Sequence, residues 1–370
     1  MKFTCKQQLL SKALSTVSKA VTTKTTMPLL KGILLNASNG VLTLSASDLD
    51  ISIERIVEAT IHEEGSLVLS AKLFSDVIRK LPNDMIQFEE KENNMVFIKC
   101  LSSEFIIVGQ PADEFPDIGK IKEVKKISLE KEILNDMIKK TSFAASIEES
   151  KGIIVGSLIE MEKEHMSMVS LDGFRMAVAK EYVKNEEPKK IIIAARILNE
   201  ISKIILETSE SDTQIHMILD EKKAVFLLKD TKIFVRLLEG DFIKYKDIIP
   251  KNYNTRVTTN RKELQDSMER ASLLSKEGKH NLVKFSISNN KLLITSRSEE
   301  GNVKEEIFIE KQGDDLDIGF NSKYVLDILK IVSDDEICME FNSSISPCIF
   351  KPIEGDQYLY LVLPVRLASN

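Results

Sequence analysis

One sequence pattern occurs three times in this chain and constrains its fold more than any other feature. Its copies span residues 69–81, 193–205 and 320–332, so they begin 124 and then 127 residues apart. Each follows a short apolar run and then carries apolar residues at helical spacing, as at Leu198, Ile201 and Ile205. A repeat of this length predicts several similar domains rather than one large core.

A second set of helical stretches supports the same division. It covers residues 9–17, 134–140 and 264–271, and each member precedes one of the first set. A chain of 370 residues is also longer than one ordinary domain. We therefore predict three domains, at residues 1–122, 123–250 and 251–370, each made of two helix-plus-strands halves. The Lys-rich stretch at 120–126 and the loop at 250–254 are the expected boundaries.

The segments between the helices read as strands and hairpins. Two apolar runs flank Asn39-Gly40, a pair that favours a tight hairpin turn, and Asn289-Asn290 occupies the corresponding place in the third repeat. The expected fold class is α+β, with far more strand than helix.

Several classes of protein are disfavoured. No apolar run is long enough to span a membrane, and the polar start at residues 1–7 lacks the apolar core of a signal peptide, so we expect a cytoplasmic protein. The four cysteines are widely spaced without a CxxC pair, which fits reduced core thiols. There is no HExxH, GxSxG or phosphate-binding glycine loop. We predict no catalytic residues, no metal and no cofactor, and we favour a binding protein.

The charge is distributed unevenly. The net charge is −6, yet the predicted helices together carry +6, which leaves −12 for strands and loops. An acidic protein with this distribution can still present a basic helical surface to a polyanion. Chance asymmetry among small numbers explains the count about as well.

Five short motifs occur in order along the whole chain. They are Thr-Met-Pro-Leu-Leu at 26–30, Pro-Ala-Asp-Glu-Phe-Pro at 111–116, Leu-Asp-Gly-Phe-Arg-Met-Ala at 171–177, Gly-Phe-Asn-Ser-Lys-Tyr-Val-Leu-Asp at 319–327 and Tyr-Leu-Val-Leu-Pro-Val-Arg-Leu at 360–367. With the repeat and the length, they make the chain resemble the bacterial DNA polymerase sliding clamp family, the beta subunit of the replicative polymerase.

The resemblance implies a head-to-tail homodimeric ring with strands outside and helices lining a hole around duplex DNA. Such a clamp catalyses nothing and needs no cofactor. It tethers the replicative polymerase, the clamp loader and repair polymerases, which insert a short Gln-Leu-x-Leu-Phe-like peptide. Contacts to phosphates carry no sequence information, which suits a protein that slides.

Residues at matching positions are carried over from the family. The DNA-facing set is Lys24, Lys72, Arg79, Lys151 and Arg196, and Gly152-Ile153 stands where family members can carry aromatic residues. The ring-interface set is Phe105, Ile107, Leu273 and Leu274.

The partner-peptide pocket is the largest set carried over. Its members are Ile154, Leu171, Gly173, Phe174, Arg175, Met176, Ile243, Ile248, Asn321, Tyr324, Ile345, Pro347, Leu361, Val362, Leu363, Pro364, Val365, Arg366 and Leu367. Two positions depart from the family: Ile243 stands where proline is common, and Asp247 stands where a basic residue can occur. We therefore expect a more acidic rim and a shifted peptide preference.

Two alternatives remain open. One is an enzyme on a repeated β-rich scaffold, which the missing motifs disfavour. The other is an oligomeric adaptor without a nucleic-acid role, which the basic helices and the five motifs disfavour. For each residue carried over from the family, the alternative is that it has no binding role and is an ordinary surface charge or core side chain.

Overall fold

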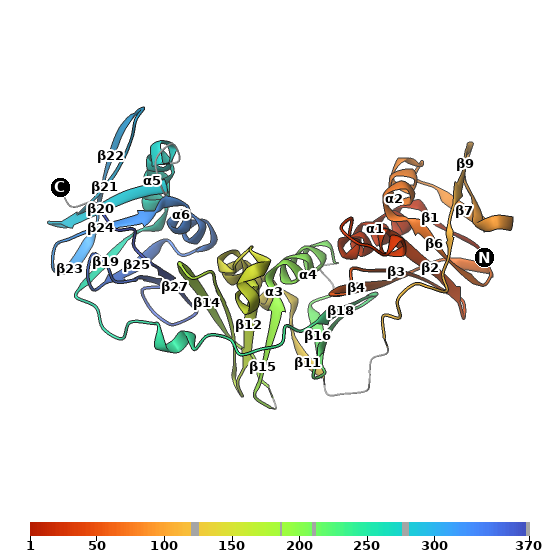
Figure 1. Cartoon of the computed structure of the whole chain (residues 1–370), viewed down its shortest axis with the longest axis horizontal. Coiled ribbons are helices and arrows are strands. Elements are labelled where there is room, and N and C mark those ends of the chain that lie inside the picture. The colour runs from red at the N-terminus through yellow and green to blue at the C-terminus, as the bar shows by residue number, and fades with distance from the viewer. Residues whose placement is uncertain (120–125, 186, 209–211, 276–280, 368–370) are drawn as a thin grey trace. The chain divides into compact units, whose positions relative to one another are not determined.

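The computed structural model describes residues 1–119, 126–185, 187–208, 212–275 and 281–367. The chain divides into two compact units (Figure 1). Unit 1 comprises Met1–Glu132 and Lys203–Leu237, and unit 2 comprises Ile133–Ser202 and Leu238–Asn370. The division passes through the predicted central domain, whose strands are shared between the units. The proposed boundary at 122/123 lies outside the described residues, and the three-domain boundaries stay a prediction.

Unit 1 contains two antiparallel sheets. The five-stranded sheet has the order β5-β1-β7-β8-β9 and the nine-stranded sheet the order β10-β6-β2-β3-β4-β18-β17-β16-β11. The strands are β1 (Lys2–Lys6), β2 (Gly32–Ser38), β3 (Val41–Ser47), β4 (Ile51–Val57), β5 (Thr60–Glu63), β6 (Gly65–Ser70), β7 (Met85–Glu90), β8 (Met95–Cys100), β9 (Ser103–Val108), β10 (Gln110–Pro111), β11 (Lys126–Glu130), β16 (Gln214–Leu219), β17 (Lys223–Leu228) and β18 (Thr231–Arg236).

Helices α1 (Gln7–Val17) and α2 (Ala71–Lys80) lie side by side in unit 1 (Figure 1). Each turns one apolar stripe inward: Leu10 and Leu14 of α1 and Phe74 and Ile78 of α2 are fully buried or nearly so. Short 3₁₀ segments follow α1 at Ser18–Ala20 and precede β2 at Pro28–Lys31.

Unit 2 also contains two antiparallel sheets. Their orders are β15-β12-β13-β14-β27-β26-β25-β19-β23 and β22-β21-β20-β24. The strands are β12 (Gly156–Met161), β13 (His165–Leu171), β14 (Arg175–Tyr182), β15 (Lys189–Ala194), β19 (Thr255–Asn260), β20 (Leu282–Ser288), β21 (Lys291–Ser298), β22 (Gly301–Phe308), β23 (Glu310–Gly313), β24 (Leu316–Asn321), β25 (Glu336–Phe341), β26 (Cys348–Lys351) and β27 (Tyr358–Val362).

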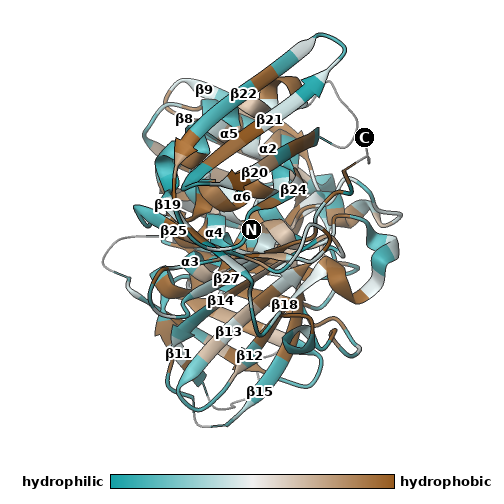
Figure 2. Ribbon diagram, turned by 90° about the vertical axis from the view of Figure 1, so that its left-hand side faces the viewer, coloured by the Kyte–Doolittle hydropathy of each residue, from teal (hydrophilic) through white to brown (hydrophobic). Residues whose placement is uncertain are grey.

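The remaining helices are α3 (Lys131–Thr141), α4 (Ala195–Glu207), α5 (Arg261–Ser275) and α6 (Ser322–Ile331), with short 3₁₀ segments at Ser142–Ala144, Glu149–Val155 and Tyr245–Asp247. Helices α5 and α6 pack together over unit 2's own core. Buried and half-buried residues alternate strictly along β20. Figure 2 shows apolar and polar residues on β20, β21 and β22 of this sheet.

The repeat predicted from the sequence is confirmed at the level of elements. Helices α2, α4 and α6 each follow a strand directly, namely β6, β15 and β24. The Asn39-Gly40 turn has φ of 52° and 73°, and Asn289-Asn290 has 47° and 56°, the left-handed pair that a two-residue hairpin requires. The α+β class with a majority of strand is confirmed.

All four cysteines are buried and free. Burial raises the pKa of the Cys5 thiol to about 12, which keeps it protonated and unreactive. Among the described residues, no helix is long and apolar enough to cross a membrane.

Candidate DNA-facing residues and partner-binding surface

The basic residues expected to face DNA in unit 1 are exposed. Lys72 and Arg79 lie seven residues apart on α2, which places them two turns apart on its solvent side, opposite Phe74. Arg79 forms an ion pair with Asp76 at 2.5 Å. Lys24 is exposed in the loop that follows α1.

Unit 2 carries the other two. Arg196 is exposed near the start of α4, whose residues Leu198 and Ile201 are buried. Lys151 is exposed in the 3₁₀ segment before β12, 3.9 Å from Glu148. The structure therefore leaves all five predicted basic side chains accessible to solvent.

An apolar cluster on one face of unit 2 gathers part of the predicted pocket. Leu171, Met176 and Leu361 are buried in it, and Ile154 packs against it half-buried. The cluster also contains residues that the resemblance did not supply. These are Leu158, Val169, Ile192, Tyr245 and Ile349, with Ile153, Val178, Leu238, Phe242, Ile249 and Leu359 packed against them.

Other predicted pocket residues lie outside this cluster. Val362 is fully buried and belongs to the larger core on the opposite face of β27, because adjacent strand residues point to opposite faces. Its side chain therefore does not line the apolar cluster, and its place in the pocket stays a prediction. Exposed side chains include Phe174, Ile243, Ile248 and Ile345, of which Ile345 is 73% exposed. Gly173 has φ of 94°, a backbone conformation that glycine adopts without strain.

Arg175 is the centre of a polar network that links distant parts of unit 2. Only 8% of it is exposed. Its guanidinium donates to Asp172 at 3.0 Å, to Asp327 of α6 at 2.6 Å and to the carbonyl oxygen of Phe143 at 2.7 Å. It also lies 4.6 Å from the ring centroid of Tyr324. This predicted pocket residue thus fixes α6 against the strand that carries it.

The C-terminal tail is attached to its unit by backbone hydrogen bonds. The amide of Leu363 donates to the carbonyl oxygen of Phe174 at 2.9 Å, and that of Val365 donates to Gly319 at 2.8 Å. Pro364 and Leu367 are half-buried and Arg366 is exposed. Two further predicted residues have local roles: Asn321 caps α6 by accepting from the Lys323 amide, and Pro347 directly precedes β26, half-buried.

The segment that carries the Ile243 and Asp247 departures is anchored by a buried carboxylate. The Tyr245 hydroxyl donates to Glu160 at 2.6 Å, and the ammonium groups of Lys190 and Lys246 lie 2.7 and 3.5 Å from the same carboxylate. Burial of Glu160 opposes ionisation, but the hydrogen bonds from Lys190 and Tyr245 outweigh it and lower the pKa of the carboxyl. Asp247 itself is exposed.

The residues expected at the ring interface differ in exposure. Leu273, in the last turn of α5, is 67% exposed, and Leu274 is half-buried. Phe105 of β9 is 38% exposed, whereas Ile107 is 8% exposed in this single chain. Its neighbours Ile106 and Val108, which the prediction omitted, are 69% and 70% exposed.

Comparison with known proteins assigns the family. The DNA polymerase III beta subunit models match along the chain, with the N-terminal domain at residues 1–119, the central domain at 128–244 and the C-terminal domain at 246–366. The beta sliding clamp of Bacillus subtilis is 32% identical over 99% of this chain and all of that protein. The chain belongs to the DNA polymerase III beta subunit family, the sliding clamps.

Solved structures agree with this assignment. The Bacillus subtilis sliding clamp has a TM-score of 0.95 at 31% identity and covers all of both chains. A beta subunit from Eubacterium rectale has a TM-score of 0.95 at 33% identity over 99% of this chain and all of that one. The sliding clamp is a non-catalytic subunit of the polymerase holoenzyme. Within the part of the chain that the structure describes, no His, Cys, Asp or Glu group could hold a metal.

Replacing Arg175 with alanine should lower the free energy of unfolding of this clamp by about 1.5 to 3 kcal/mol, because two half-buried carboxylates and a carbonyl oxygen lose a buried, charged hydrogen-bond donor. Urea denaturation followed by circular dichroism measures the change. Lys323→Ala removes a 66%-exposed partner 3.7 Å from the same Asp327 and should cost about 0 to 1 kcal/mol. Equal effects of the two substitutions would contradict the role assigned to Arg175.

Proposed function

We propose that this clamp assembles as a head-to-tail homodimer that encircles duplex DNA in the cytoplasm. It contacts phosphates through Lys24, Lys72, Arg79, Lys151 and Arg196. It binds the replicative polymerase, the clamp loader and repair polymerases through a Gln-Leu-x-Leu-Phe-like peptide. Each chain contributes three domains, at 1–122, 123–250 and 251–370.

The observation that carries the DNA-binding proposal is the exposure of basic side chains on two of the repeated helices, α2 and α4. Lys72 and Arg79 of α2, and Arg196 of α4, point away from apolar stripes that anchor the helices. Such side chains can pair with phosphates without disturbing the core. Weak ionic contacts suffice when topology, rather than affinity, retains the ring on DNA.

Two sheet edges support the dimer proposal. Strand β9 ends the five-stranded sheet and β22 ends the four-stranded one. Exposed apolar residues lie on or near both, including Ile106 of β9 and Phe308 of β22, the latter 74% exposed. An edge strand offers unpaired N–H and C=O groups to another chain. Head-to-tail joining of β9 from one chain with β22 from another would cover both edges and close a ring.

The apolar cluster on unit 2 supports the peptide proposal. Leucine and phenylalanine side chains of a partner require an apolar surface with a few orienting polar groups. Ile154, Val178 and Leu359 supply half-buried apolar side chains, and the tail adds Leu363 and Pro364 beside Phe174.

Replacing Lys24, Lys72 and Arg196 together with alanine should flatten the salt dependence of DNA binding. Each lost phosphate contact lowers the slope of log K against log salt by roughly 0.9. Fluorescence anisotropy with a short labelled duplex over a salt series measures this slope. The control variant replaces three lysines on strands with alanine and should leave the slope unchanged; they are Lys180 of β14, Lys223 of β17 and Lys351 of β26. Equal slopes for both triple variants would rule out the proposed DNA-facing set.

A further inference from the structure

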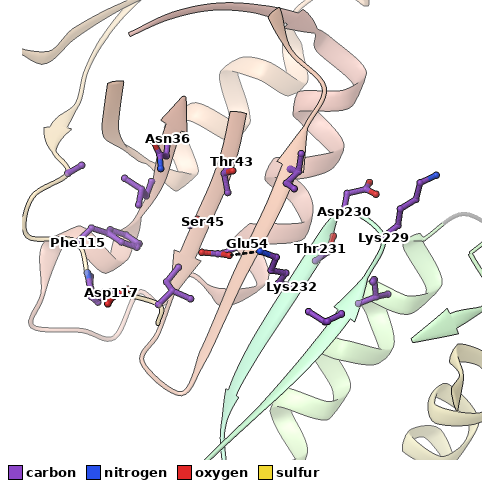
Figure 3. A pocket seen from close by; sticks show the side chains of 17 residues that line it. Asn36, Thr43, Ser45, Glu54, Phe115, Asp117, Lys229, Asp230, Thr231 and Lys232 are labelled. Carbon is purple, nitrogen blue, oxygen red and sulfur yellow. Dashed lines mark ion pairs between the residues drawn. The ribbon is translucent and has the colours of Figure 1, made fainter. Parts of the chain in front are cut away.

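A concave site lies entirely within unit 1. Its volume is about 490 Å³, within the range of ligand pockets. Strands β2, β3, β4, β18 and β17, which are consecutive in the nine-stranded sheet, line it together with the turn between β17 and β18, and the loop at residues 112–118 borders it (Figure 3). We call this site the unit 1 groove.

The centre of the unit 1 groove carries a carboxylate whose ion pair is long. Glu54 of β4 is half-buried, and its nearest ion partner is Lys232 at 3.9 Å, the outer limit for an ion pair (Figure 3). Burial raises the pKa of Glu54, Lys232 lowers it, and the negative charge of Asp117 across the groove raises it again. A cation that reached both carboxylates would relieve this unfavourable environment.

The rest of the groove offers apolar contacts. Ile118 and Leu227 pack half-buried against a small cluster of Ile218, Val225 and Phe234. Ile56 of β4 also lines the groove and is 46% exposed. A ligand would therefore meet an aliphatic surface directly beside the two carboxylates.

The fold repeats this site in unit 2, where the proposed partner peptide binds. In unit 1 the amide of Ile51 donates to Asp48 at 2.8 Å, and in unit 2 that of Arg175 donates to Asp172 at 3.0 Å, so the two turns correspond. The strands that follow these turns, β4 and β14, pair with β18 and β27 in the same way. Three residues after the start of each strand, Glu54 lies opposite Lys232 in unit 1 and Val178 lies opposite Leu359 in unit 2.

The two equivalent positions thus have the same backbone pairing but different side chains. An aliphatic pair in unit 2 is replaced by an acidic and a basic residue in unit 1, and Asp117 adds a second carboxylate. Three acidic residues and two lysines line the groove, which leaves an excess of one negative charge beside apolar residues; they are Glu54, Asp117, Asp230, Lys229 and Lys232. A peptide of leucine and phenylalanine alone would cover these charged groups and supply no cation for the excess carboxylate.

We propose that the unit 1 groove binds an extended peptide segment of a partner protein in which an arginine adjoins a leucine-like residue. The guanidinium pairs with Glu54 and Asp117, because its planar donors match carboxylates. The aliphatic side chain packs on Ile118 and Leu227. This proposal extends the function proposed above by adding a second peptide class on the same chain.

The test uses the dimeric full chain and two probes, acetyl-Gly-Leu-Arg-Leu-Gly-amide and the same peptide with citrulline, which has arginine's shape without its charge. Methyl NMR should show saturable shifts at Ile56, Ile118 and Leu227 with the arginine probe. Citrulline should bind about tenfold more weakly or worse, the loss expected for a charged hydrogen bond. Glu54→Gln should weaken the arginine probe by a similar factor.

Matched variants make the result decisive. Glu58→Gln removes a charge from an exposed residue just beyond β4, outside the groove, and should change nothing. Asp117→Asn changes an exposed loop residue and should weaken binding of the arginine probe severalfold. It tests the same charge interaction independently if Glu54→Gln disturbs the fold. Deletion of the C-terminal tail should leave this binding intact, which separates the groove from the unit 2 surface. Equal binding of both probes, shifts confined to Leu171 and Leu361, or no shifts at millimolar peptide would overturn the proposal.

Discussion

Replacing Leu273 and Leu274 together with alanine should convert the clamp from a dimer into soluble monomers. Leu273 is 67% exposed in the single chain, so its truncation removes little from the fold of its own domain. Burying such a leucine in a joint contributes about 1.5 to 3 kcal/mol, and a head-to-tail dimer has the joint twice. Light scattering over a dilution series should give the dimer mass for the parent and half of it for the variant.

Leu206→Ala is the matched control, since this leucine is 62% exposed on α4. It should leave the mass and the unfolding curve unchanged. If the double variant stayed dimeric on dilution, α5 would not lie at the joint. If it unfolded, Leu274, the half-buried member, would be a core residue of its own domain.

Deleting the chain from Leu363 onward should abolish binding of a Gln-Leu-Asp-Leu-Phe peptide while the protein stays dimeric. The deletion removes the residues that bond to Phe174 and Gly319 and thereby one edge of the proposed peptide site. For the parent we expect micromolar affinity, about −8 kcal/mol, because a short peptide must be ordered on binding. Isothermal titration calorimetry measures both.

Arg366→Ala provides a graded comparison for the deletion. Its side chain is exposed, so it should weaken the peptide by less than the deletion does. Asp247 is exposed and lies two residues after the anchored Tyr245. Peptides with a basic flanking residue should therefore bind better than peptides with an acidic one, and high salt should remove the difference. Full-strength peptide binding to the shortened chain would place the site elsewhere.

The sequence predicted the features that local patterns determine. The Asn39-Gly40 and Asn289-Asn290 turns follow from residues that adopt positive φ, and the stripes of α2, α4 and α6 follow from helical spacing. The family motifs supplied Leu171, Met176 and Leu361 of the apolar cluster. These elements depend on neighbours in sequence or on short strings, which one sequence contains.

Contacts between distant residues could not be predicted in this way. The bond from Arg175 to Asp327 spans 152 positions, and that from Tyr245 to Glu160 spans 85. The first pair joins β14 to helix α6 and the second joins a 3₁₀ segment to β12, so tertiary packing rather than local sequence brings each pair together. Strand alternation does carry one signal that motif matching ignored: Leu361 and Val362 must face opposite ways, so both could not lie on one surface. The same reasoning applies to Ile106 and Ile107.

Retention on closed and open DNA tests the encircling clamp most directly. The protein is loaded by a clamp loader onto a nicked circular plasmid, and half of the sample is then linearised. We expect protein to remain on the circles and to leave the linear molecules rapidly by sliding off their ends, as measured by gel filtration of labelled clamp with DNA. Equal loss from circular and linear DNA would contradict topological retention and, with it, the central claim.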